Sequence, residues 1–235
     1  MGSEHPSARI GERHVAIDVI AGVIRKAIAG RGDERMLLLR QLWIELRRFS
    51  ASNVRNIPLS RIRAIHDVHV AGPIDQTDAL VVSAIAAVLE CDTIFMFGPA
   101  RDTGTVLAHN LPEAQIYALV PPEPESLAAA RSHPRQPAGN IARLAGSAAT
   151  FDLSRYSGKS DLVFIDGVRD LREETDAAFS LLSELGTIIW DNYTHSAAAY
   201  AYLNALAPAL DRPVFHLLGT RLALYSRWDI VRPYD

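Results

Sequence analysis

The sequence has little of what several classes of protein require. It contains one cysteine, Cys91, so it cannot form an internal disulfide, which suits a reducing cytosol. No apolar run is long enough to span a membrane, and the first residues lack the apolar segment of a signal peptide. The formal net charge of -3 gives no positive excess for binding nucleic acid. These absences predict a soluble, cytoplasmic protein with neither a membrane nor a nucleic acid as partner.

The composition is that of an ordinary globular enzyme. Of the 235 residues, 49% are hydrophobic and 22% are charged, which suffices for one α/β domain with a sizeable core and an appendage. Regular alternation of apolar runs and helical patterns begins near Cys91, after a strongly helical stretch. We therefore expect an N-terminal helical extension over residues 1–74 and an α/β domain over residues 75–235.

The N-terminal extension carries two helical patterns, over residues 14–29 and 33–49. Their apolar stripes pack either on their own domain or on a second subunit as a homodimer, and both alternatives are open. Residues 50–74 are mixed and loop-like. His66 and His69 there are either surface histidines or, if the segment is helical, a metal-binding pair.

The α/β domain is predicted to hold five strands of the parallel type, followed by a hairpin around Gly219-Thr220. The predicted strands cover residues 93–97, 114–120, 140–144, 161–166 and 187–191, then 214–218 and 222–226 in the hairpin. The predicted helices and helical turns cover residues 76–90 with Asp75 as N-cap, a stretch that ends at His109, 123–132, 151–156, 170–185 and 196–206. Gly186 stands where a C-cap glycine belongs after the helix at 170–185.

Polar side chains end two neighbouring strands of this pattern. Asp166 follows one apolar run, and Asp191 and Asn192 follow the next, with a helical stretch between the two runs. Such a strand–helix–strand unit is right-handed, so its polar ends meet at the edge where open α/β sheets bind ligands. Carboxylate and amide oxygens are the ligands that Mg²⁺ or Ca²⁺ prefers. The alternative is structural: Asp166 caps the next helix, and Asp191-Asn192 forms a turn.

A glycine-containing loop over residues 98–104 follows the first predicted strand. A strand, a glycine turn and a helix N-terminus bring backbone N–H groups toward a nucleotide-like ligand, and Gly98 and Gly104 permit close approach. Alternatively, these glycines only shape the turn.

Taken together, these motifs resemble the class I S-adenosylmethionine-dependent methyltransferases. The resemblance covers roughly residues 75–227, and it is most specific in TFDLSRYSGKSDLVFIDG and TIIWDNY. The sequence is most similar to the catechol and caffeoyl-CoA type O-methyltransferases and to the cephalosporin-pathway methyltransferase-like group. The resemblance implies a Rossmann-like fold with a mostly parallel seven-stranded sheet, a C-terminal antiparallel hairpin and an N-terminal helical extension.

The resemblance also implies a reaction, which is O-methylation of a small-molecule acceptor, as in natural-product biosynthesis. S-adenosylmethionine would be the methyl donor, and a divalent ion, Mg²⁺ or Ca²⁺, would be held by Asp166, Asp191 and Asn192 and would acidify the acceptor hydroxyl. The donor-binding positions are Gly98, Asp102, Gly104, Val120, Ser147 and Asp166.

Several positions depart from the family's pattern. Met96 replaces an acid, Asp102 replaces a glycine unless Gly104 serves, and Val120 replaces the acid that binds the ribose hydroxyls. Ser147 replaces an aspartate that reads the adenine edge, and Arg169 replaces a lysine or histidine base. Arginine stays protonated, so Arg169 can stabilise an anion but cannot take a proton.

His195 is a spare candidate base, with a solvent-exposed residue at a helix N-terminus as the alternative. The eroded donor positions also leave a second function open, in which the fold has lost donor binding. Such a protein would catalyse a different reaction or act as a non-catalytic partner. A dinucleotide-dependent oxidoreductase is disfavoured, because the sequence lacks Gly-x-Gly-x-x-Gly and an acid after the second strand.

Overall fold

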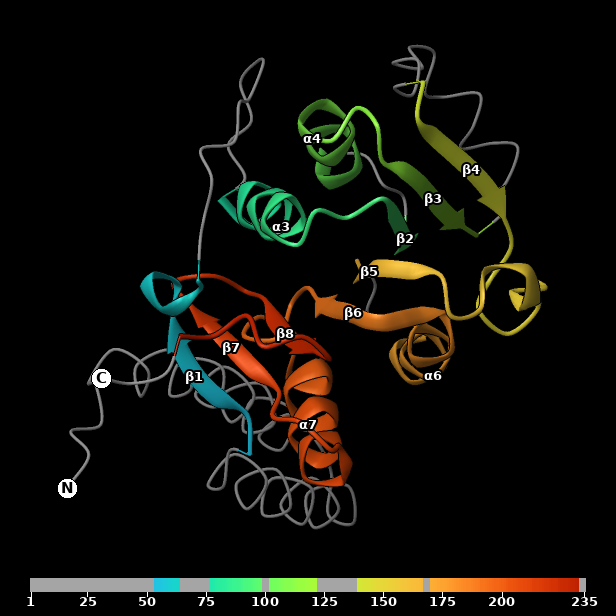
Figure 1. The fold of residues 1–235 in the computed structure, drawn as a ribbon. Coiled ribbons are helices and arrows are strands. Elements are labelled where there is room, and N and C mark those ends of the chain that lie inside the picture. The colour runs from blue at the N-terminus through green and yellow to red at the C-terminus, as the bar shows by residue number, and fades with distance from the viewer. Residues whose placement is uncertain (1–52, 64–76, 99–101, 122–138, 167–169, 233–235) are drawn as a thin grey trace, which may run out of the picture.

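The computed structural model describes residues 53–63, 77–98, 102–121, 139–166 and 170–232 (Figure 1). These residues build one eight-stranded sheet in the order β1-β7-β8-β6-β5-β2-β3-β4. All neighbouring strands pair in parallel except the two pairs that β8 makes, with β6 and with β7. The predicted mostly parallel α/β sheet with a C-terminal antiparallel hairpin is therefore confirmed.

The strands and helices follow one another along the chain as the sequence alternation indicates. The strands are β1 Arg55–Pro58, β2 Thr93–Phe97, β3 Gln115–Val120, β4 Ile141–Ala145, β5 Ser160–Ile165, β6 Leu182–Trp190, β7 Phe215–Leu218 and β8 Ala223–Ser226. The helices are α3 Thr77–Val88, α4 Asp102–Asn110, α6 Leu171–Leu181 and α7 Ala197–Leu206, with short 3₁₀ turns at Leu59–Arg61, Ser154–Tyr156 and Ala207–Ala209.

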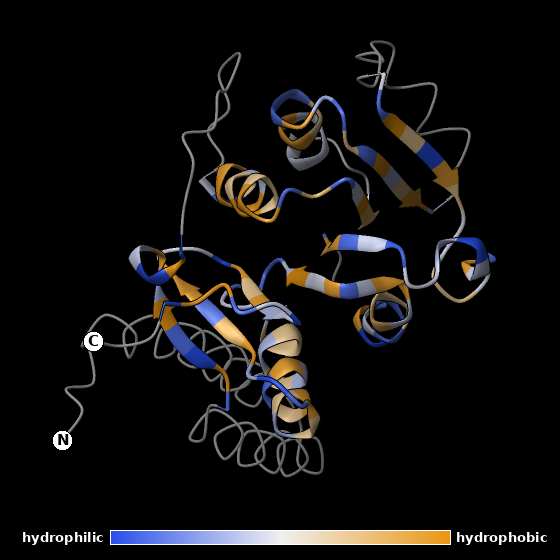
Figure 2. Cartoon of the chain, in the orientation of Figure 1, coloured by the Kyte–Doolittle hydropathy of each residue, from blue (hydrophilic) through white to orange (hydrophobic). Residues whose placement is uncertain are grey.

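Helices cover both faces of the sheet, which makes three layers (Figure 1). Alternate residues of β2 point to opposite faces: Ile94 and Met96 pack in the core that includes α3 and α4, whereas Phe95 and Phe97 pack in the core that includes α6 and α7. Burial on both faces explains why β2 reads as a continuous apolar run. Figure 2 shows the difference between the helices: α3 is mostly hydrophobic, whereas α6 carries many hydrophilic residues.

One strand was not expected from the sequence. Arg55–Pro58 was predicted to be loop-like, but it forms β1 and pairs in parallel with β7 at the edge of the sheet. Four residues ending in proline carry no periodic signal, and an edge position tolerates proline. The sheet therefore has eight strands instead of seven, and β1 ties part of the expected extension to the α/β domain.

The unit β5–α6–β6 has the predicted order but different bounds. The helix ends at Leu181 instead of Leu185, so Gly186 lies inside β6 and is not a C-cap glycine. The pairing register shifts between Ser160↔Leu182 and Leu162↔Thr187, so β6 bulges there. Tertiary pairing overrides the local cap signal, because Arg227 donates from its backbone N–H to the Gly186 carbonyl at 3.0 Å.

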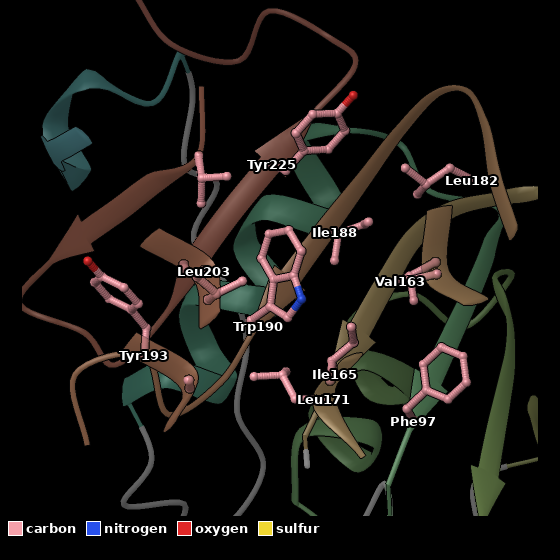
Figure 3. Packing of buried hydrophobic residues seen from close by; sticks show 14 of the residues in the cluster. Phe97, Val163, Ile165, Leu171, Leu182, Ile188, Trp190, Tyr193, Leu203 and Tyr225 are labelled. Carbon is pink, nitrogen blue, oxygen red and sulfur yellow. The ribbon is translucent and has the colours of Figure 1, made fainter. Parts of the chain in front are cut away.

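The core beneath β6 is centred on an aromatic residue. Trp190 is fully buried, and its indole Nε1–H donates to Thr175 Oγ1 at 3.0 Å. Figure 3 shows Trp190 among Ile165, Leu171 and Leu203, which come from β5, α6 and α7. The last strand of the predicted βαβ unit is thereby locked to both helices of its face.

Several predictions fall outside the described residues. These are the helices at 14–29 and 33–49, the pair His66 and His69, Asp75 as N-cap, and the helix at 123–132. A homodimer through the N-terminal helices accordingly stays a prediction. Within the described part of the chain, no helix has both the length and the apolar character that a membrane span needs.

The close approach at Gly186 can be tested by adding one methyl group. A Cβ at this position would lie 2.8 Å from the Ser160 backbone oxygen and 2.8 Å from Leu182 Cδ2. We expect Gly186→Ala to lower the free energy of unfolding by about 1–3 kcal/mol, because the backbone of β5 or β6 must shift. Urea unfolding measures this change. Gly139→Ala is the control, since nothing lies within 4 Å of its added Cβ, and equal stability of the two variants would contradict the prediction.

Candidate active site at the carboxyl ends of the strands

The chain reverses its direction of strand addition between β2 and β5. From β2 the sheet extends through β3 to β4, and from β5 it extends through β6 on the other side. Backbone hydrogen bonds hold the ends of these strands level: Asp166 N–H donates to Phe97 O at 2.9 Å, and Asp191 N–H donates to Ile165 O at 3.0 Å. Gly98, Asp166 and Asp191 therefore end three adjacent strands at a topological switch point, where α/β sheets bind ligands.

Gly98 brings two strand ends unusually close together. Its φ is +119°, and an added Cβ would lie 3.1 Å from the Asp166 Cβ and 3.3 Å from the Asp166 backbone oxygen. Only glycine tolerates this conformation and this contact without strain. The group that approaches Gly98 within the protein is Asp166, and the predicted approach of a ligand to this glycine stays a prediction.

The rest of the predicted glycine loop is shorter than expected. Helix α4 begins at Asp102, so Gly104 lies in the first turn of this helix and is buried there. The prediction of a loop reaching residue 104 is wrong. An acidic residue at a helix N-terminus is favoured by the helix dipole, which explains the earlier start. The side chain of Asp102 lies outside the described part of the structure.

The positions expected to bind the methyl donor with acids are apolar. Met96 is fully buried in the core between the sheet and α3 and α4, and Val120 packs partly buried against the same core. Ser147 follows Gly146, and its hydroxyl shares a hydrogen bond of 3.0 Å with Thr150 Oγ1. In this region the described residues therefore offer a nucleoside apolar contacts, hydroxyls and backbone groups.

Acidic side chains gather on the other side of the switch point. Burial, followed by the charges of Asp170, Asp166 and Glu173, raises the pKa of Glu174 from 4.5 to about 7. Glu174 Oε2 is buried and has no hydrogen-bond partner. The N-cap position of α6 is Asp170, which makes no side-chain capping hydrogen bond.

Asp191 is the most deeply buried of the predicted ligands, at 7% exposed. Its Oδ1 accepts the backbone N–H of Asn192 at 2.6 Å, and its Oδ2 accepts the side-chain amide of Asn192 at 3.1 Å. Asn192 adopts a left-handed conformation with φ +62°, which turns both donors back toward the carboxylate. Burial raises the pKa of Asp191, although the Asn192 hydrogen bond and the Arg221 charge act in the opposite direction.

Two residues that the sequence analysis missed complete this cluster. Arg221, between β7 and β8, donates from Nε to Asp78 Oδ2 at 2.7 Å, and the same nitrogen lies 3.6 Å from Asp191 Oδ1. Asp78 belongs to the first turn of α3, 143 residues away in sequence. The only sequence signal was one arginine within an apolar hairpin, LLGTRLALY, and it gives no indication of its partner.

The described geometry does not fit a divalent ion at Asp191. Both carboxylate oxygens already accept hydrogen bonds, Asn192 presents an N–H group to them, and a guanidinium stands 3.6 Å away. Among the described residues, no three His, Cys, Asp or Glu side chains are grouped so that they could hold a metal ion. The three-ligand site of Asp166, Asp191 and Asn192 stays a prediction.

The two candidate bases contribute less to the described site. Arg169 lies outside the described residues. His195 is exposed at the turn before α7, where its Nδ1 pairs with Thr194 Oγ1 at 3.0 Å and its backbone N–H donates to Asn192 O at 3.1 Å. Its position matches the solvent-exposed alternative, although its charge lowers the pKa of Asp191 slightly.

The acidic cluster predicts how stability changes with pH. The pKa of Glu174 is higher in the folded protein than in the unfolded chain, so the folded state binds more protons between pH 4.5 and about 7. Stability accordingly falls as pH rises through this window. We expect Glu174→Gln to remove this loss and to be more stable than the parent at pH 8 by up to about 3 kcal/mol, with little difference at pH 4.

Urea unfolding at the two pH values measures this effect. Glu173→Gln is the matched control, because this neighbour is exposed, and we expect it to change stability by less than about 0.5 kcal/mol. A Glu174→Gln effect of equal size at pH 4 and pH 8 would contradict the assignment of the raised pKa to this carboxyl.

Comparison with solved structures supports the fold independently of the sequence patterns. No protein-family model and no curated protein matches the sequence. A methyltransferase from Geobacter sulfurreducens superimposes with a TM-score of 0.50 at 11% identity, covering 65% of this chain and 79% of that one. An O-methyltransferase from Bacillus cereus in complex with S-adenosylhomocysteine gives a TM-score of 0.49 at 15% identity, covering 67% of this chain and 81% of that one. The Streptomyces achromogenes O-methyltransferase of tomaymycin synthesis, solved with S-adenosylmethionine, gives 0.48 at 16% identity, with 71% and 83% covered. At these identities the likeness concerns the fold alone: the chain has the Rossmann-like fold of class I methyltransferases.

Proposed function

We propose that the protein transfers a methyl group from S-adenosylmethionine to an oxygen atom of a small-molecule acceptor. The observation that carries the proposal is the contact of Gly98 with Asp166 at the switch point of the sheet. This contact joins a glycine turn, which lets a ligand approach the backbone, to a carboxylate at the next strand end. Family resemblance and fold support the choice of methyl transfer, whereas fold alone would allow other reactions.

The donor would lie over the ends of β2, β3 and β4. A nucleoside-type ligand would approach the backbone at the end of β2, and Ser147 can hydrogen-bond an adenine edge in exchange for its bond to Thr150. Val120 would lie beside the ribose and cannot accept hydrogen bonds from its hydroxyls. Donor binding therefore lacks the charge-assisted hydrogen bond that an acid would give, which contributes about 1.5–3 kcal/mol. We therefore expect weak donor binding.

The acceptor would lie over the ends of β5 and β6. In the proposed reaction the acceptor oxygen bonds to the methyl carbon as the carbon–sulfur bond of the sulfonium breaks, and the proton of the acceptor hydroxyl leaves to a base or to water. Alignment of the two reactants supplies much of the acceleration, so a strong base is not required. Asp191 and His195 are candidates to receive this proton, and Arg169 is not one because it stays protonated.

The sequence also predicts that a divalent metal ion assists the reaction, but the proposed methyl transfer does not require one. Mg²⁺ at Asp166, Asp191 and Asn192 would hold and acidify the acceptor hydroxyl. The hydrogen bonds on Asp191 and the nearby guanidinium weigh against direct binding of an ion there. Loss of activity on chelation with EDTA, restored by Mg²⁺, would bring the metal back into the mechanism.

A second candidate function is supported by the apolar donor positions. Met96 is fully buried and Val120 is packed against the core. Neither side chain can supply the hydrogen-bond acceptor that an acid would provide there. In this alternative the protein keeps the fold without the methyl donor, and it either catalyses another reaction or acts as a non-catalytic partner. Donor binding separates the two functions.

Calorimetric titration with S-adenosylhomocysteine tests the proposed function. We expect saturable binding, and we expect Gly98→Ala to weaken it about tenfold or more, because the added Cβ forces Asp166 away and strains a backbone at φ +119°. Thermal unfolding checks that the variant remains folded, and Gly139→Ala is the control. No binding to the parent protein at millimolar ligand would reject the proposal in favour of the second candidate.

A restored acid gives the converse test. We expect Val120→Asp to tighten S-adenosylhomocysteine binding by about 10- to 100-fold, because the new carboxylate accepts hydrogen bonds from the ribose hydroxyls. The same titration measures this change, and Val120→Asn separates the effect of charge from the effect of polarity. Unchanged affinity of the aspartate variant would mean that no ribose lies at the end of β3.

A further inference from the structure

Arg221 is held in place by its backbone as well as by its side chain. The Arg221 carbonyl accepts the backbone N–H of Tyr193 at 2.8 Å, which fastens the β7–β8 turn to the turn after β6. Tyr193 is buried and its ring stacks on Tyr200 of α7, so this contact rests on the core. The guanidinium therefore starts from a fixed point beside Asp191 and Asn192.

The side chain of Arg221 joins acids from two layers of the fold. Its Nε lies 2.7 Å from Asp78 Oδ2 and 3.6 Å from Asp191 Oδ1. The two carboxylates are mostly buried, with side-chain exposures of 15% and 9%, whereas the arginine side chain is 37% exposed. A buried carboxylate needs a compensating charge, and Arg221 is the cation that the described residues place beside both.

The neighbouring carboxylates stabilise the charged form of Arg221. The hydrogen bond to Asp78 and the charges of Asp191, Asp78 and Asp166 raise the pKa of Arg221, against a smaller opposing effect of burial. The charge of Arg221 thus interacts with Asp166 at the end of β5 and with Asp191 at the end of β6. By distance, its Nε lies between Asp78 and Asp191, the second of which was predicted to bind an ion.

A divalent ion and this guanidinium compete for the same oxygen. Mg²⁺ and Ca²⁺ bind carboxylate oxygens at about 2.0–2.6 Å. With Arg221 Nε 3.6 Å from Asp191 Oδ1, an ion on that oxygen would lie within a few ångströms of a fixed positive charge that cannot be discharged by deprotonation. Either the ion or the guanidinium can occupy the space at Asp191.

We infer that Arg221 is a positioning residue that supplies, at Asp191, the positive charge for which a divalent ion was expected, so that the acceptor end of the site works without a metal. The inference deepens the proposed function and rests on it for the meaning of that end. The two terminal amino groups of Arg221 have no partner among the described residues, and the partly exposed side chain keeps the charge accessible to a ligand.

Binding of Mn²⁺, measured by electron paramagnetic resonance on the full chain without donor, tests this inference. We expect the parent protein to bind no Mn²⁺ with a dissociation constant below about 1 mM. We expect Arg221→Gln to gain Mn²⁺ binding at least about tenfold tighter than the parent, because Asp78 and Asp191 are then left without a cation. Adding Asp191→Asn to this variant should abolish the gain.

Two further variants keep the test decisive. Arg221→Lys preserves the charge and should exclude Mn²⁺ as the parent does, so a lysine variant that binds Mn²⁺ would overturn the inference. Arg63→Gln removes an arginine that lies 3.1 Å from Asp229 in an exposed pair away from the strand ends, and it should gain no Mn²⁺ binding. Thermal unfolding of each variant confirms that it is folded.

The outcomes separate this inference from the proposed function. Tight Mn²⁺ binding by the parent that Asp191→Asn removes would overturn the role of Arg221, and so would a folded Arg221→Gln variant that gains no binding. Either result leaves methyl transfer intact if S-adenosylhomocysteine still binds. Conversely, a parent that excludes Mn²⁺ through Arg221 and fails to bind S-adenosylhomocysteine would refute the proposed function and keep the charge assignment.

Discussion

The site depends on the pairing of β2 with β5, because this pairing sets two strand ends side by side. Phe97 and Ile165 are in register, the N–H of Asp166 donates to the Phe97 carbonyl, and Gly98 has no Cβ to hold the two ends apart. The apolar run of each strand is buried on both faces, which fixes the register strongly. In the proposed function, the methyl donor lies on the β2 side of this contact and the acceptor on the β5 side.

The parts of the fold that were predicted from sequence are those whose signal is local. β2 was predicted with its observed bounds, and the β7–β8 hairpin was predicted around its glycine turn, because burial and turn chemistry act over a few residues. The wrong predictions share one cause, which is that residues far away in the sequence determine the local structure. β1 pairs with the edge strand β7, and Gly186 lies in β6 because Arg227 donates to its carbonyl, in the stretch where the register with β5 shifts. Local propensity cannot contain such information.

The same reasoning applies to the candidate site. Gly98, Asp166, Asp191 and Asn192 were identified because each directly follows an apolar run, and the sheet does place three adjacent strand ends there. Asp78 and Arg221 were missed because the pair is 143 residues apart and neither lies in a motif. The missed pair changes the chemistry of the found residues: an acid that reads as a metal ligand in the sequence is, in the fold, the partner of a guanidinium.

The charge distribution around the switch point is consequently unequal. The ends of β2 and β3 carry Met96 and Val120, where the family resemblance implies acids, whereas on the other side the charges of Asp166 and Asp170 help to raise the pKa of the buried Glu174. Burying Asp191 beside a guanidinium adds little to stability, since an apolar pair of similar volume is often at least as stable. Its burial is therefore explained better by the site than by the fold. A fixed arginine holds such a carboxylate in one orientation without the loss and rebinding of an ion, and in the proposed reaction the acceptor would meet the carboxylate in this orientation.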